Sequence, residues 1–105
     1  MSEVPTISLE DAQAQFTEKS ALFVDIRDAR SIAEAHIPES KTLNNGNALQ
    51  FVTETAKDQP IVVYCYHGNN SKMVTTYLLE QGFEDVKSMN GGFEDWRLKF
   101  ETASS

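Results

Sequence analysis

The sequence contains a single cysteine, Cys65, in 105 residues. One cysteine cannot form an internal disulfide, so no covalent cross-link within the chain holds the fold. Cys65 is therefore either a small buried hydrophobic residue or a reactive thiol. Residue type alone favours the buried structural role, so the surroundings of Cys65 decide between the two.

Basic residues are also scarce. Nine Lys and Arg residues are scattered among 16 Asp and Glu residues, which gives a formal net charge of -7. Binding to nucleic acid or to an anionic membrane surface needs basic side chains gathered on one face, so neither is expected. The sequence lacks the run of about 18–20 apolar residues that spans a membrane. Residues 1–10 lack the basic and apolar segments of a secretory signal, so we expect a cytoplasmic protein.

The length and composition fit one globular domain. A second hydrophobic core would need roughly another hundred residues. Hydrophobic residues make up 40% of the chain and charged residues 24%, which is typical of a soluble protein with one core. We expect a single domain over residues 1–105, with its core over about residues 6–100 and a frayed polar tail at 101–105.

Hydrophobic periodicity predicts strands that alternate with helices. The expected strands cover 5–7, 22–26, 61–64 and 86–89, and the expected helices cover 9–18, 28–35, 48–56, about 71 to the stop at Gly82, and 93–100. The segment 61–64 reads Ile-Val-Val-Tyr and carries no charge, which is typical of a strand buried on both faces of a parallel sheet. The alternation predicts an α/β fold with a mainly parallel sheet and helices on both of its faces.

Cys65 directly follows the strand predicted at 61–64, at the edge where open α/β sheets bind ligands. Gly68 permits the backbone conformations that let successive N–H groups converge on an anion. The next helix, with Asn70 or Ser71 as its N-cap, adds the positive end of its dipole. Such surroundings favour a thiolate. The strand end, the glycine loop and the helix start together favour a reactive thiol over a structural one.

The segment around Cys65 is poor in acidic residues. Between Asp58 and Glu80 the chain has no carboxylate and one basic residue, Lys72, so this segment would not repel an anionic substrate. A buried strand and its following helix also exclude acids for purely structural reasons, and Lys72 is equally consistent with a solvated surface lysine. His67 is either a base or a rim residue, and we favour the rim because backbone N–H groups already stabilise the thiolate.

The neighbours of Cys65 also narrow the thiol chemistry. Cysteine phosphatases need an arginine six positions after the nucleophile, to bind the phosphoryl oxygens in a bidentate manner. That position is Ser71 in this sequence. A dithiol oxidoreductase needs a second cysteine, which the chain lacks. What remains is a thiolate that accepts one sulfur atom and passes it on.

Four motifs resemble those of single-domain rhodaneses. They are Cys-Tyr-His-Gly-Asn at 65–69, Val-Asp-Ile-Arg-Asp at 24–28, His-Ile at 36–37 and Gly-Gly-Phe-Glu-Asp-Trp at 91–96, and the resemblance covers about residues 6–100. The resemblance implies a five-stranded, mainly parallel rhodanese-like sheet, with Cys65 as the nucleophile in a loop at 65–70. The substrate-binding residues that it implies are Tyr66, His67, Gly68, Asn69, Asn70, Ser71 and Lys72.

The resemblance also implies a reaction. The thiolate takes the sulfane sulfur of thiosulfate, releases sulfite, carries a persulfide, and passes that sulfur to cyanide or to a thiol acceptor, with thioredoxin as a candidate partner. No metal and no cofactor are implied, and a monomer is expected. Two alternatives stay open: a rhodanese-fold binding or regulatory module with an idle thiol, and a carrier that receives its persulfide sulfur from a partner protein.

Several further positions carry specific expectations. Asn70 stands where the family often has Ser, Thr or Arg, so an amide donor is expected to replace a hydroxyl contact to the sulfur. Asp25 and Arg27 point to the same side of an extended segment and are placed to pair. His36 is expected to be a hydrogen-bonded structural histidine, and Trp96 is expected to lie in the core.

Overall fold

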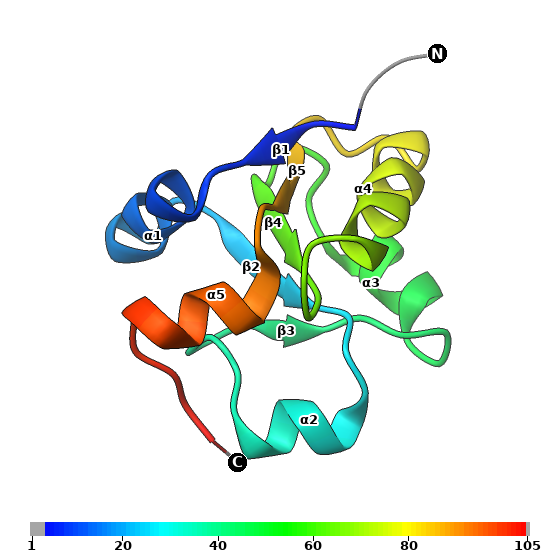
Figure 1. The fold of residues 1–105 in the computed structure, drawn as a ribbon. Coiled ribbons are helices and arrows are strands. Elements are labelled where there is room, and N and C mark those ends of the chain that lie inside the picture. Colours follow the sequence, from blue (N-terminus) through cyan, green and yellow to red (C-terminus); the bar gives the residue numbers. More distant parts are fainter. Residues whose placement is uncertain (1–3, 105) are drawn as a thin grey trace.

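The computed structural model describes residues 4–104 and contains one sheet of five parallel strands, in the order β1-β5-β4-β2-β3 (Figure 1). The strands are β1 (Thr6–Ile7), β2 (Leu22–Asp25), β3 (Lys41–Thr42), β4 (Ile61–Tyr64) and β5 (Val86–Met89). The helices are α1 (Leu9–Glu18), α2 (Ala29–Glu34), α3 (Ala48–Glu54), α4 (Asn70–Glu80) and α5 (Gly92–Lys99). The predicted α/β fold with a parallel sheet is confirmed.

Strand β4 lies at the centre of the sheet. Its neighbours are β2 and β5, with Val24 opposite Val63 and Val63 opposite Ser88. Every residue of β4 is buried, because an uncharged run of β-branched and aromatic residues would expose apolar surface at a solvated edge. The carboxyl end of β4, where Cys65 follows, is therefore placed in the middle of one edge of the sheet.

Helices cover both faces of the sheet, and each face has its own core. Helices α1 and α5 pack on one face, where Phe16, Phe23 and Trp96 contact one another with ring centroids 5.6 to 5.9 Å apart. Helices α3 and α4 cover the other face (Figure 1). Alternate residues of β4 contribute to the two cores, since Val62 belongs to the first and Val63 to the second. Trp96 is fully buried, which confirms its expected place in the core.

Strand β3 and the carboxyl-terminal tail differ from what hydrophobic periodicity predicts. Two residues, 41–42, form β3, and so short an edge strand shows no alternation in the sequence. The tail, which was expected to fray at 101–105, is held at Ala103, whose N–H and carbonyl groups both pair with His36 at 2.8 Å. His36 Nδ1 also lies 2.8 Å from the Ile32 carbonyl oxygen, in the structural role expected for this histidine. Ser105 lies outside the described residues.

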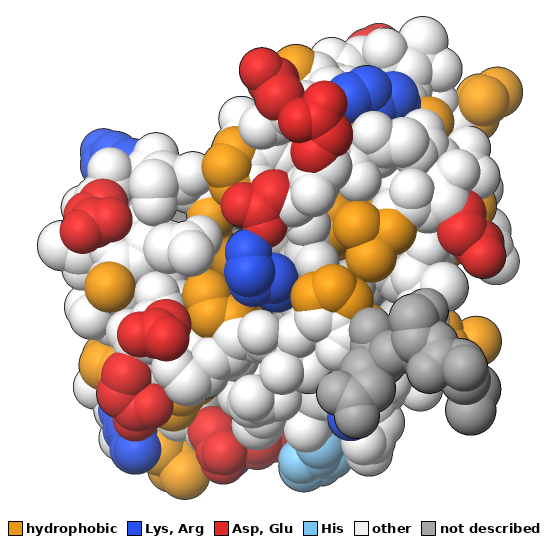
Figure 2. All heavy atoms as spheres, turned by 90° about the horizontal axis from the view of Figure 1, so that it is seen from above, with side chains coloured by type: hydrophobic (Ala, Val, Ile, Leu, Met, Phe, Trp, Pro, Cys, Tyr) orange, Lys and Arg blue, Asp and Glu red, His pale blue; other side chains and the backbone are white. Residues whose placement is uncertain are grey.

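Charged side chains are scattered over the surface that Figure 2 shows. On this face, seen from above relative to Figure 1, acidic side chains are spread widely and Lys and Arg side chains stand singly among them. This is the scattered arrangement that the sequence predicts. Within residues 4–104, no helix combines the length and the apolar character needed to cross a membrane.

Helix α1 ends at a residue in a left-handed conformation, and from this strain we predict how a substitution changes the free energy of unfolding. Lys19 has a φ of 57°, its N–H donates to the Phe16 carbonyl, and the Ser20 N–H donates to the Gln15 carbonyl. Glycine adopts this conformation without the Cβ strain that lysine carries. We expect Lys19→Gly to raise the free energy of unfolding by about 1 kcal/mol. Urea denaturation measures this change.

The matched control for this change is Lys19→Ala, which removes the same charge but keeps the Cβ atom. It should give no increase in stability. A Lys19→Gly protein no more stable than Lys19→Ala would contradict the role assigned to backbone strain.

Candidate active site

Cys65 lies at the turn that leads from β4 to α4. The residue is only 4% exposed and lies at the carboxyl end of the central strand. The chain then forms a short loop, with Gly68 at a φ of 97°, before α4 begins at Asn70. The strand, glycine loop and helix thus follow in the order that the sequence predicts, and the loop spans 65–69 rather than 65–70.

Hydrogen-bond donors converge on the sulfur of Cys65. The N–H groups of Gly68 and Ser71 donate to Cys65 Sγ, at 3.2 and 3.3 Å respectively. The Ser71 hydroxyl oxygen lies 3.5 Å from the same sulfur. Burial raises the pKa of the Cys65 thiol, but hydrogen bonds from the Ser71 hydroxyl and from the N–H groups of Ser71, Gly68 and His67 more than offset this, so the pKa is lowered. The loop therefore favours the thiolate.

The start of α5 holds the loop from the other side. The Phe93 N–H donates to the Cys65 carbonyl at 2.8 Å, and the Glu94 N–H donates to the Tyr66 carbonyl at 3.0 Å. This close approach of two backbones depends on Gly92, because a Cβ atom there would lie 2.4 Å from the Tyr66 carbonyl oxygen. The sequence suggests a turn at the adjacent glycines 91 and 92, but the contact of Gly92 with the loop after Cys65 is a long-range one that periodicity cannot predict.

Asp25 and Arg27 form a buried ion pair beside the loop, as their spacing predicts. Arg27 Nη2 lies 2.7 Å from Asp25 Oδ2, and Arg27 Nε lies 3.0 Å from Asp25 Oδ1. Arg27 Nη2 also donates to the Ala35 carbonyl at 2.6 Å. The guanidinium carbon lies 4.1 Å from the centre of the Phe93 ring and 5.6 Å from that of Tyr66. The pair thus connects β2 with both the loop and α5.

A carboxylate from a distant segment reaches the loop. The Tyr66 hydroxyl hydrogen bonds to the Asp28 carboxylate and lies 2.7 Å from Ser31 Oγ. Hydrogen bonds from Tyr66 and from Ser31 lower the pKa of Asp28 to about 2, so this side chain is ionised at neutral pH. The absence of acids between residues 58 and 80 therefore does not make the neighbourhood of the loop free of negative charge.

Two expectations about the start of α4 are wrong. Its N-cap is Asn69 rather than Asn70 or Ser71, and the Asn69 side chain makes no capping hydrogen bond. Asn70 is exposed in the first turn, so it does not replace a hydroxyl contact to the sulfur. That contact comes from Ser71, whose side chain is buried and turned inward. Ser71 in turn lies 2.6 Å, oxygen to oxygen, from Ser88 on β5, a residue that sequence reasoning missed.

The remaining predicted site residues fall into two groups. Tyr66 is half-buried and Gly68 is buried, so both belong to the inner part of the loop. His67, Asn69 and Lys72 are exposed and form its rim, together with Asn70. The rim position favoured for the His67 side chain agrees with this exposure.

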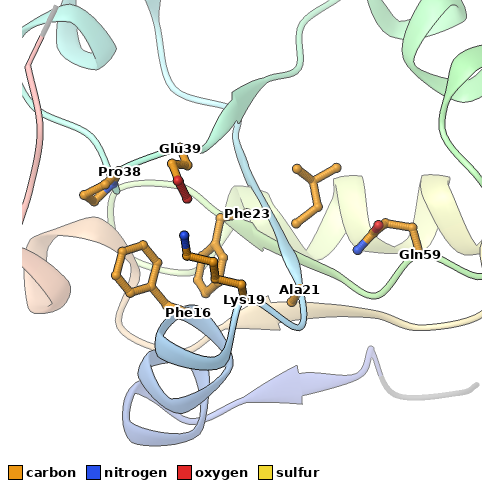
Figure 3. Close-up of a pocket in the computed structure, with 8 residues that line it drawn as sticks. Phe16, Lys19, Ala21, Phe23, Pro38, Glu39 and Gln59 are labelled. Carbon is orange, nitrogen blue, oxygen red and sulfur yellow. The ribbon is translucent and has the colours of Figure 1, made fainter.

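A hollow at the opposite edge of the sheet does not include Cys65 (Figure 3). It is lined by Phe16, Lys19, Ala21, Leu22, Phe23, Pro38, Glu39 and Gln59. Lys19 and Glu39 point toward one another across it, above the ring of Phe16. The residues that line this hollow include no cysteine, so it does not offer the thiol chemistry of the loop at Cys65.

Comparisons with known proteins identify the family of this chain. The rhodanese-like domain model matches residues 8–99. The thiosulfate sulfurtransferase GlpE of Pseudomonas savastanoi pv. phaseolicola is 45% identical over 100 residues, which is 95% of this chain and 93% of that protein. The GlpE of a Pseudomonas fluorescens strain is 47% identical over 105 residues, covering 98% and 95%. The crystal structure of the Alr3790 protein from Anabaena, at 18% identity, shares the fold with a TM-score of 0.85 over 94% of this chain and 82% of that one. The chain therefore belongs to the rhodanese-like domain family.

Proposed function

We propose that this protein is a thiosulfate sulfurtransferase that carries sulfur as a persulfide on Cys65. The observation that carries the proposal is the convergence of the Gly68 and Ser71 N–H groups on Cys65 Sγ at the carboxyl end of β4. A cysteine that only fills space in the core does not need charge-stabilising donors. Relatives of similar length that are 45% and 47% identical and named thiosulfate sulfurtransferase support the choice of substrate.

The proposed reaction has two steps. The Cys65 thiolate attacks the sulfane sulfur of thiosulfate, a new S–S bond forms, the bond to the sulfonate sulfur breaks, and sulfite leaves with the electron pair. An acceptor thiolate or cyanide then attacks the outer sulfur of the persulfide and displaces the Cys65 thiolate. Neither step needs a metal or a cofactor, because each is a nucleophilic substitution at a sulfur atom with a stable sulfur anion as the leaving group. The backbone donors of the loop stabilise the anion at the start and at the end of each cycle.

The rim of the loop is where we place the substrates. The exposed residues of the loop and of the first turn of α4 are His67, Asn69, Asn70 and Lys72. Lys72, in the first turn of α4, supplies a positive charge that attracts the thiosulfate dianion, while Asp28 beside Tyr66 opposes it. We further propose that the protein works in the cytoplasm as a monomer, with a thiol or dithiol protein such as thioredoxin as the acceptor.

Mass spectrometry tests this function directly. After incubation with thiosulfate, the intact protein should gain the mass of one sulfur atom, and cyanide should remove it and form thiocyanate. Cys65→Ser is the matched control, because it replaces the sulfur by oxygen in the same position and should gain nothing. No adduct on the wild-type protein, or an equal adduct on Cys65→Ser, would show that the proposal is wrong.

The same assay separates the alternatives. A carrier fed by a partner protein would gain sulfur from a protein persulfide but not from thiosulfate. A binding module with an idle thiol would gain it from neither, and its thiol would titrate with an ordinary pKa. The lowered pKa of Cys65 favours a working thiol over an idle one.

A further inference from the structure

A buried chain of three side chains ends at the sulfur of Cys65. Ser88 lies on β5 and is 1% exposed, and its Oγ is 2.6 Å from Ser71 Oγ. Ser71, on α4, is fully buried, and its Oγ is 3.5 Å from Cys65 Sγ. The chain thus runs from the sheet through the first turn of a helix to the thiol, away from solvent.

The hydrogens in this chain can be arranged in two directions. In the first, the Ser88 hydroxyl donates to Ser71 Oγ and the Ser71 hydroxyl donates to Cys65 Sγ, so every hydroxyl hydrogen has an acceptor. In the second, the thiol donates to Ser71 and Ser71 donates to Ser88. The hydroxyl hydrogen of Ser88 then has no acceptor, because within residues 4–104 Ser71 Oγ is the one hydrogen-bond partner of Ser88 Oγ. A buried donor without an acceptor is costly, so the first direction is favoured.

The backbone agrees with the first direction. The N–H groups of Gly68 and Ser71 both point at Cys65 Sγ, so the sulfur already acts as an acceptor. The Ser71 hydroxyl, as a third donor, further stabilises a thiolate. If the sulfur were a thiol, its hydrogen and the Ser71 hydroxyl hydrogen would compete for the space between the two atoms. The three donors therefore act together only when the sulfur carries the negative charge.

We propose that Ser88 is a positioning residue whose hydroxyl donates to Ser71 Oγ and thereby fixes the Ser71 hydroxyl as a donor to Cys65 Sγ. Ser88 does not touch the sulfur itself. Without its hydroxyl, Ser71 Oγ loses a donor and its own hydrogen is free to rotate away from the thiolate. The proposal rests on the proposed role of Cys65 as the nucleophile.

The experiment is the pH dependence of alkylation of Cys65 by iodoacetamide, in the wild-type protein and in Ser88→Ala. The thiolate is the reacting form, so the rate rises as pH passes the pKa. In Ser88→Ala the midpoint should move to higher pH. Well below that midpoint the rate should fall about threefold to tenfold, the effect of one hydrogen bond, and at high pH the two rates should agree.

The other charged and titratable groups around the loop are the same in both proteins, so the shift reports on the hydroxyl. On the loop and the start of α4 they are Tyr66, His67 and Lys72, and on the segments in contact with the loop they are Asp25, Arg27, Asp28, Tyr64 and Glu94. Circular dichroism confirms that each variant is folded before its profile is compared.

Thr75→Val is the matched control. Thr75 is also a fully buried hydroxyl residue on α4, and its Oγ1 donates to the Ser71 carbonyl at 2.7 Å, outside the chain that reaches the sulfur. Its substitution should leave the pH profile unchanged. Ser88→Thr, which keeps a hydroxyl, should restore the wild-type profile.

Several results would overturn the proposal. A wild-type profile in Ser88→Ala is one, and a shift as large in Thr75→Val is another. A wild-type pH profile in Ser71→Ala would also overturn the proposal. If Ser88→Ala does not fold, the profile of Ser71→Ala is the test. In Ser71→Ala the additional change Ser88→Ala should have no further effect. Sulfur uptake from thiosulfate by the wild-type protein is measured in parallel, and its absence would count against the proposed function, whichever way the pH profiles fall.

Discussion

Replacing Arg27 by methionine is expected to lower the free energy of unfolding by about 3–5 kcal/mol. The carboxylate of Asp25 is fully buried, and Arg27 is its ion-pair partner through two nitrogen atoms. Methionine preserves much of the length of the arginine side chain but leaves a buried negative charge without compensation. Because a domain of this kind is stabilised by about 5–15 kcal/mol, this loss is a large fraction of the total stability. Urea denaturation followed by circular dichroism measures the loss.

The chain offers a matched control for this change. Arg97 pairs with Glu94 at 2.9 Å on the surface of α5, where about half of the Arg97 side chain is exposed. Arg97→Met should cost less than about 1 kcal/mol, because water and salt already screen that pair. If Arg27→Met were no more destabilising than Arg97→Met, burial of the Asp25–Arg27 pair would not have the energetic importance assigned to it. The double variant Asp25→Leu/Arg27→Met should recover much of the loss, since it removes both charges.

Replacing Gly92 by alanine is expected to lower the rate of sulfur transfer about 100-fold, the order of effect that a displacement of about 1 Å has on a reacting group. The new Cβ atom would lie 2.4 Å from the carbonyl oxygen of Tyr66 and 2.7 Å from the amide nitrogen of His67. Both are backbone atoms of the loop and cannot rotate away as a side chain would. The loop must therefore move, and the donors that converge on Cys65 Sγ move with it. The rate of thiocyanate formation from thiosulfate and cyanide measures the effect.

Gly82→Ala separates this clash from simple backbone strain. Gly82 also has a positive φ, 100°, but a Cβ atom there would meet nothing within 4 Å. The variant should lose some stability, as Gly92→Ala does, and keep its rate of sulfur transfer. Comparable rates in Gly92→Ala and the wild-type protein, at a temperature where both are folded, would show that the loop tolerates the added methyl group.

Much of the fold could be predicted because the signals are local. The uncharged run at 61–64 predicted a buried central strand, and it is one. The two-residue spacing of Asp25 and Arg27 predicted an ion pair, and the structure has it. Cys65 was placed correctly for the same reason, since the end of a strand, a glycine and the start of a helix lie close together in the sequence.

Two kinds of feature could not be predicted: contacts between distant segments, and the exact residue at which a helix begins. The residues around Ala103 in the sequence do not predict its pairing with His36. The residues around Ser88 do not predict its contact with Ser71. From the family pattern, an amide donor of Asn70 was expected to replace a hydroxyl contact to the sulfur. A hydroxyl contact is present and comes from Ser71, because the helix starts at Asn70 and turns the next side chain inward. One residue of helical phase decides which side chain meets the thiol.

The hydrogen bonds from α5 to the loop also determine when the site is completed during synthesis. The carbonyl groups of Cys65 and Tyr66 receive their hydrogen bonds from Phe93 and Glu94, which the ribosome adds well after the loop itself. Contacts of such sequence separation close late, once the intervening chain has been made. A nascent chain that has emerged only as far as β5 lacks the helix whose N–H groups bind the loop carbonyls. We therefore expect the loop to reach its final geometry only after α5 has been made and has packed against it.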